Sequence, residues 1–228
     1  MGMDEVGGSA EDLHFPSVRV SYWRMATTFV GIECGGNRMR ARHAAVVLHR
    51  LKGKVLLSEW SCRIYTDEEL LGYLAAEAGQ SGVIALHGRD AESTSELMKR
   101  IYRVLDYRVI FSLAPKHRTR ALVRVDPGEV QRAFGGGEER QALSVLDGMR
   151  LLTPAVDFRP LTQYLEGLPI SGKMRAQSNA ALRAAMAAYA ALWCWWHGPA
   201  GYDVLGASTE NYRLAPRMMD YEPDTGGA

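Results

Sequence analysis

The stretch Thr28-Phe29-Val30-Gly31-Ile32-Glu33 decides the fold prediction, because it is a short apolar run that ends in an acid. The segment Cys34-Gly35-Gly36-Asn37 follows it directly, and its glycines are typical of a turn. A second apolar run, 44–50, comes soon after that segment. We therefore expect a buried strand that carries the Glu33 carboxylate to a turn, after which the chain returns as a second strand.

The rest of the chain is rich in further strand and helix patterns. Apolar or β-branched runs between turn residues predict strands at 28–33, 44–50, 54–61, 82–87, 107–112, 120–125, 202–205 and 211–214. Thr66 with Glu69 three residues later is a capping-box pattern, which predicts a helix that ends at Gly79. Further helices are expected over 90–105, 127–134, 138–152, 158–165 and 179–196.

The order of these elements favours one α/β domain. Three consecutive strands with short connections predict an antiparallel meander, and the alternation of helices and strands after them predicts parallel neighbours. We expect an RNase H-like mixed sheet with helices on both faces. The domain is predicted to span 21–217, with a disordered N-terminal tail at 1–20 and a C-terminal tail at 218–228, since both ends are rich in glycine and acid.

Composition narrows the function classes. The 27 basic and 26 acidic residues nearly cancel, so no strong overall field attracts nucleic acid. Cys34, Cys62 and Cys194 lack the paired spacing of a zinc site, and with no signal-peptide pattern they favour a reducing, cytoplasmic setting. The apolar run 180–196 contains Arg183 and is short for a membrane span, so no membrane association is expected.

Three segments together carry a resemblance to a known family. They are Val30-Gly31-Ile32-Glu33, the run Val123–Val130 with Pro127, and the alanine-rich run Leu182–Ala191. In this order and spacing they resemble the Gly-Ile-Asp, Glu-x-x-Pro and Leu-Asp-Ala-Leu-x-Ala-Ala-Tyr motifs of the DUF429 family, a group of predicted RNase H-like nucleases. The resemblance covers about 28–216 and implies an α/β fold that cleaves phosphodiester bonds of nucleic acid.

The resemblance also implies a metal cofactor, Mg²⁺ or Mn²⁺. Two-metal hydrolysis needs three or four carboxylates around ions that lie about 3.5–4 Å apart. In an active enzyme, Glu33, Asp90 and Asp126 would be the metal ligands. His87 would then orient the attacking water or the leaving group.

This chain departs from the family pattern at four positions. Glu33 is one methylene longer than the family's aspartate, and His87 stands where the family tends to place an acid. Arg124 and Arg183 take the places of two further acids. Because arginine does not deprotonate, Arg183 brings a fixed positive charge to a metal-ligand position. We therefore expect Arg183 to pair with Glu33 instead of a cation, and phosphodiesterase activity to be weak or absent.

Ordinary structural roles compete with these interpretations. Glu33 could be a solvated strand-end acid, His87 a hydrogen-bonded strand-end residue, and Arg183 a surface side chain that extends from its helix. Aromatic packing is the main expectation for the end of the last long helix. A protein partner or self-association surface there is the alternative, formed by Trp193, Trp195 and Trp196.

Two basic segments leave a binding function open. They flank predicted strand ends, where a nucleic-acid backbone would lie in this fold. Their residues are Arg38, Arg40 and Arg42 in one segment and Lys116, Arg118 and Arg120 in the other. A non-catalytic scaffold that binds nucleic acid or protein is therefore a rival to the nuclease. A sugar-kinase-like ATP-binding fold is disfavoured, because the chain is short for two lobes and lacks a phosphate-loop pattern.

Overall fold

The computed structural model describes residues 27–35, 43–78, 82–88, 90–113, 120–135, 139–168, 171–206 and 212–218. Its strands are β1 (Thr27–Cys34), β2 (His43–Leu51), β3 (Lys54–Tyr65), β4 (Gly82–Gly88), β5 (Arg108–Val109), β6 (Ala121–Arg124), β7 (Tyr202–Leu205) and β8 (Arg213–Pro216). Its α-helices are α1 (Asp67–Glu77), α2 (Ala91–Leu105), α3 (Pro127–Phe134), α4 (Glu139–Gly148), α5 (Arg159–Glu166) and α6 (Gly172–His197). Two 3₁₀ turns, Met149–Leu151 and Gly198–Gly201, complete the described elements.

The main sheet has six strands in the order β3-β2-β1-β4-β6-β5. β1, β2 and β3 pair antiparallel, whereas β1–β4, β4–β6 and β6–β5 pair parallel. The fold is therefore the predicted RNase H-like mixed α/β sheet, with an antiparallel meander followed by parallel strands. β7 and β8 form a separate two-stranded sheet.

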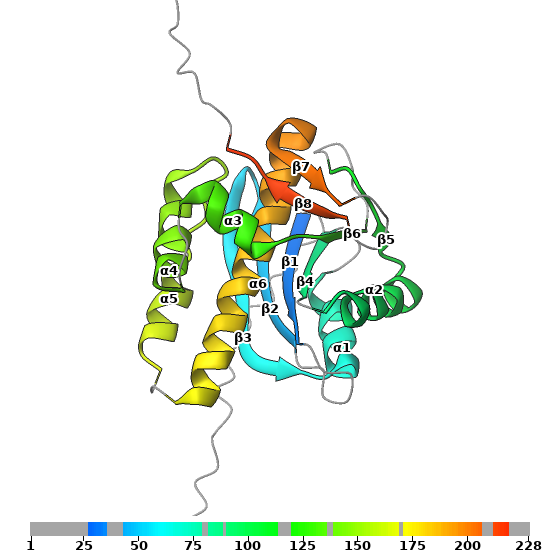
Figure 1. Ribbon diagram of the computed structural model, residues 1–228, viewed down its shortest axis with the longest axis horizontal. Helices are drawn as coiled ribbons and strands as arrows, with labels where there is room; N and C mark the ends of the chain where they lie inside the picture. Colours follow the sequence, from blue (N-terminus) through cyan, green and yellow to red (C-terminus); the bar gives the residue numbers. More distant parts are fainter. Residues whose placement is uncertain are drawn as a thin grey trace, which may run out of the picture.

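Helices cover both faces of this sheet. Alternate residues of one strand point to opposite faces, so Phe29 packs in the core that includes α3 to α6, and Val30 packs in the core of α1 and α2. Figure 1 shows α6 crossing the sheet over β1 and β2 with α3, α4 and α5 beside it, while α1 and α2 lie on the other side. This two-faced burial explains why β1 is apolar almost throughout.

The close approach of α6 to β1 depends on Gly31. A Cβ added at Gly31 would lie 1.9 Å from the carbonyl oxygen of Ala184 and 2.3 Å from the backbone nitrogen of Ala188. Only a glycine on the strand, facing small residues on the helix, permits this contact between two backbones. The contact places the middle of α6 directly above the carboxyl-terminal half of β1.

Most local signals in the sequence are confirmed. Thr66 and Glu69 form both hydrogen bonds of the capping box, and Pro127 occupies the first turn of α3. The differences are in lengths. α6 begins at Gly172 rather than at 179, because Ser171 caps it and its first turns are polar and exposed, so no apolar periodicity marks them.

The predicted strand 107–112 is wrong in its extent. Only Arg108–Val109 form a strand beside β6, and the Ile110 nitrogen adds one backbone hydrogen bond to Leu122 before the segment turns away to meet Tyr202 and Tyr212. The two predicted tails, 1–20 and 218–228, lie almost wholly outside the described residues. None of the described helices combines the length and the apolar character that a membrane span requires.

Candidate functional site

Glu33 lies at the end of β1 with its carboxylate enclosed by two partners. The Nε of Arg183 on α6 donates a hydrogen bond of 2.8 Å to Oε1 of Glu33. The Nδ1 of His87, at the end of β4, donates to the other oxygen, Oε2. The Glu33 side chain is 7% exposed, against 16% for His87 and 24% for Arg183. The expected pairing of Glu33 with Arg183 is present.

The topology explains why these three residues meet. Glu33 and His87 are direct partners in the parallel register of β1 and β4. Both side chains therefore point to the same face, next to each other at the carboxyl ends of the strands. Arg183 reaches that face because Gly31 and the alanines of α6 hold the helix against β1.

The electrostatics of this cluster do not suit a divalent cation. Both carboxylate oxygens of Glu33 already accept strong hydrogen bonds, and the fixed charge of Arg183 balances the carboxylate. Mg²⁺ and Mn²⁺ require several oxygen ligands with free lone pairs. Within the described part of the chain, no group of three or more His, Cys, Asp and Glu side chains is placed to hold a metal ion. These residues do not fit the cofactor that the family resemblance implies.

Asp90 and Asp126, the other two expected metal ligands, serve as helix caps. Asp90 is exposed and accepts hydrogen bonds from the backbone nitrogens of Glu92 and Ser93 at the start of α2. Asp126 accepts from the backbone nitrogen of Gly128 at 2.8 Å and lies 3.4 Å from a guanidinium nitrogen of Arg213. The structure thus brings Glu33, His87 and Arg183 into contact and gives the two aspartates separate tasks.

A second polar cluster lies next to the site, on the α1 and α2 face. His43 Nε2 is 2.9 Å from Asp67, and Arg100 on α2 binds both Asp67 and Glu68. Cys34 is also buried on this face, and burial together with the nearby Glu33 charge raises the pKa of its thiol well above the usual value. A thiol of this kind stays protonated and is not a nucleophile. The contacts that His43 of β2 and Arg100 of α2 make at the start of α1 join these two helices to the sheet.

The predicted nucleic-acid contacts fall mostly outside the described residues. Arg38, Arg40, Arg42, Lys116 and Arg118 all lie there. The sixth of these residues, Arg120, is described, and its Nη1 donates to the carbonyl oxygen of Leu105 at 2.9 Å. Arg120 thus fixes the end of α2 to the start of β6.

The proposed tryptophan surface is wrong for two of its three residues. Trp193 and Trp195 are buried at 3% and 5% exposure. Trp193 donates from its indole nitrogen to the carbonyl oxygen of Gly201, and Trp195 packs edge-on against Phe29. Trp196 is half-buried beside the Arg50 guanidinium. These rings face inward because α6 is covered by the sheet on one side and by α3, α4 and the β7–β8 hairpin on others.

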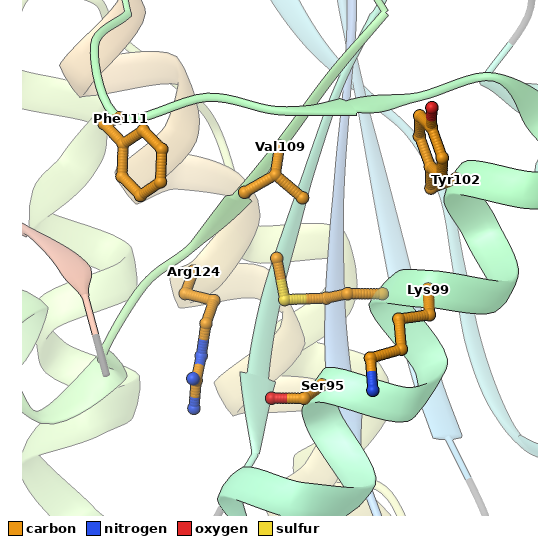
Figure 2. Close-up of a pocket in the computed structure, with 7 residues that line it drawn as sticks. Ser95, Lys99, Tyr102, Val109, Phe111 and Arg124 are labelled. Carbon is orange, nitrogen blue, oxygen red and sulfur yellow. The ribbon is translucent and has the colours of Figure 1, made fainter. Parts of the chain in front are cut away.

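A feature that the sequence analysis missed lies on the opposite face, between α2 and β5–β6. A cavity of about 330 Å³ is lined there by Ser95, Met98, Lys99, Tyr102, Val109, Phe111 and Arg124 (Figure 2). The signal available in the sequence was weak. It consisted of Ser95, Lys99 and Tyr102 at helical spacing on α2, and of a cation, Arg124, at a strand end.

Comparison with known proteins adds no relative. The chain matches no known family model, and a search of curated proteins finds no match.

Proposed function

We propose that this chain is a non-hydrolytic RNase H-like domain that resembles the DUF429 predicted nucleases. In this proposal it binds nucleic acid or protein and does not cleave phosphodiester bonds. The observation that supports this proposal is the enclosed Glu33 carboxylate, with Arg183 on one oxygen and His87 on the other. A permanent cation at this position opposes a divalent ion and uses the ligand that the ion would need. The competing proposal, a nuclease with Glu33, Asp90 and Asp126 on Mg²⁺ or Mn²⁺, would require this ion pair to open.

Metal-dependent thermal stability tests the proposal. A ligand that binds only the folded state raises the melting temperature. At a concentration some fiftyfold above Kd it adds about 2 kcal/mol to the free energy of unfolding. We expect about 5 mM Mn²⁺ to leave the wild-type melting temperature within about 1 °C of its value in a chelator. Arg183→Asp would place a second carboxylate beside Glu33 and is expected to create stabilisation by Mn²⁺.

The matched control is Arg175→Asp, which changes the same charge in the exposed first turns of α6 and should not create a response to Mn²⁺. An activity assay completes the test, with single-stranded and duplex DNA and RNA as substrates in Mn²⁺. Cleavage by the wild type that disappears in Glu33→Gln would overturn the proposal. So would wild-type stabilisation by Mn²⁺ that depends on Glu33.

A further inference from the structure

The cavity between α2 and β5–β6 has the position of a ligand site in an open α/β sheet. Arg124 is the last residue of β6 and pairs with Leu86 near the end of β4. The end of the cavity that Arg124 lines therefore lies at the carboxyl ends of parallel strands. Ligands of open α/β sheets bind at this edge. Arg124 alternates with Val123 and Val125 of the α6 face, so its side chain is on the α2 face, away from the α6 side where Glu33 and Arg183 meet.

One part of the cavity wall is apolar and aromatic. Tyr102, Val109 and Phe111 are 52%, 39% and 42% exposed, although large apolar side chains are normally buried. Met98 adds a buried side chain to the lining. Exposed apolar groups that gather around one hollow mark a binding surface more often than scattered ones do. This wall suits a flat aromatic or other apolar group.

The wall of the cavity is apolar almost throughout, and polar groups of three lining residues stand at its other end. Figure 2 shows the guanidinium of Arg124, the ammonium of Lys99 and the hydroxyl of Ser95 at the same end, away from Val109 and Tyr102. Among the described residues, Lys99 has a 3.7 Å contact with Glu96, and both of these side chains are exposed. Of the described lining residues, two carry positive charge and none is a carboxylate. A planar guanidinium with a nearby ammonium and hydroxyl matches a phosphate or a carboxylate.

The walls are fixed in place before any ligand arrives. The Phe111 ring packs on Tyr212 with 4.4 Å between ring centroids, and the Tyr212 hydroxyl donates to the carbonyl oxygen of Ile110 at 3.1 Å. The Tyr202 hydroxyl accepts from the backbone nitrogen of Leu113 at 2.8 Å. On the other side, Arg120 holds the end of α2. A site that is already formed avoids the entropy loss of ordering its walls on binding.

We propose that this cavity binds a small ligand in which an aromatic group is joined to a phosphate or carboxylate. A volume of about 330 Å³ is within the range of small-molecule sites and suits a mononucleotide or an aromatic acid. The aromatic group lies against Phe111, Val109 and Met98, and the anion meets Arg124, Lys99 and Ser95. This site is separate from Glu33, so its test is independent of the metal test above.

Calorimetric titration of the full chain tests the proposal with two anionic probes, adenosine 5′-monophosphate and 2-naphthoate. Their uncharged counterparts, adenosine and 2-naphthalenemethanol, are titrated in parallel. We expect saturable binding of at least one anion below about 1 mM and at least about tenfold weaker binding of its uncharged counterpart. Binding of the nucleotide alone, of the naphthoate alone or of both supports the site, and the pattern distinguishes a nucleotide from an aryl acid.

Variants locate the binding. Arg124→Gln should weaken the anion about tenfold or more, since it removes a charge-assisted contact, and Lys99→Gln should weaken it about two- to threefold. Ser95→Glu places a carboxylate in the cavity and should abolish binding, so it tests the site even if the Arg124 variant fails to fold. Arg103→Gln is the matched control, because Arg103 is an exposed cation on α2 that does not line the cavity. The proposal is overturned if neither anion saturates below about 5 mM, if the uncharged probes bind as well, or if Ser95→Glu binds as the wild type does.

Discussion

Arg183 and Arg124 lie at the same edge of one sheet but on opposite faces, and their surroundings differ. On the α6 face, Arg183 and His87 enclose the Glu33 carboxylate in a nearly buried cluster. On the α2 face, Arg124 lines an open cavity together with Lys99 and with aromatic and aliphatic side chains. Arg183 reaches the strand ends from a helix and pairs with a buried acid, which makes it part of the framework. Arg124 ends a strand beside a hollow, which makes it a candidate for recognition.

The largest expected effect is the loss of the close contact that builds the Glu33 side. Gly31→Ala would place a Cβ 1.9 Å from one backbone atom of α6 and 2.3 Å from another, and neither atom can move without shifting the helix. We expect destabilisation of about 4 kcal/mol or more, measured by urea unfolding. Gly72→Ala in α1 is the control, because no atom lies within 4 Å of its added Cβ. It should stabilise the protein by about 0.5–1 kcal/mol.

A stability of Gly31→Ala within about 1 kcal/mol of the wild type would contradict this account. It would mean that α6 can move away from β1. The contrast between a rigid cluster and an open cavity would then no longer hold.

The next effect is that of removing one partner from the Glu33–Arg183 pair. Arg183→Met leaves a buried carboxylate without its counter-charge and should cost about 3 kcal/mol in the free energy of unfolding. The double variant Glu33→Gln with Arg183→Met should recover part of that loss, with a coupling energy of about 1–3 kcal/mol. Lys99→Gln, the charge removal on the cavity side, should change stability by less than about 0.5 kcal/mol.

Additive single-variant effects in this cycle would break the comparison. They would show that Glu33 and Arg183 contribute to stability independently. A large loss of stability in Lys99→Gln would also contradict the comparison, since that lysine is assigned to recognition.

The sequence predicted the framework better than the sites. The order of strands and helices and the capping box of α1 follow from local patterns, and the Glu33–Arg183 contact follows from motif positions within an assumed fold. The direct His87–Glu33 hydrogen bond was not predicted, although parallel strands that end together bring such residues side by side. The cavity was out of reach. It depends on how far the segment after β5 turns toward Tyr212, which is a matter of tertiary packing.

Mild acid gives the smallest of these effects, and the group that carries it, His49, lies on the cavity-side face. His49 of β2 lies on the α1 and α2 side, next to the hydroxyl of Thr28, and burial lowers its pKa from 6.5 to about 4. The folded state therefore binds this proton less readily than the unfolded chain. The stability contributed by neutral His49 is complete above about pH 6.5 and is lost as the pH falls toward about 4.

By about pH 5 this loss should reach about 2 kcal/mol. Urea unfolding of the wild type and of His49→Gln, measured between about pH 7.5 and pH 5, checks the prediction, because the variant should lack this part of the slope. Equal slopes in both proteins would assign the acid sensitivity to other groups.

The separation of 150 positions between Glu33 and Arg183 has a consequence for biosynthesis. A ribosome releases β1 to β6 well before α6, so the face of the sheet that α6 covers has no cover while the chain is being made. Contacts of such long range slow folding and leave apolar surface exposed to aggregation. The nascent chain therefore depends on its last quarter to complete the domain, and a truncation before Gly172 would remove the helix that covers this face of the sheet.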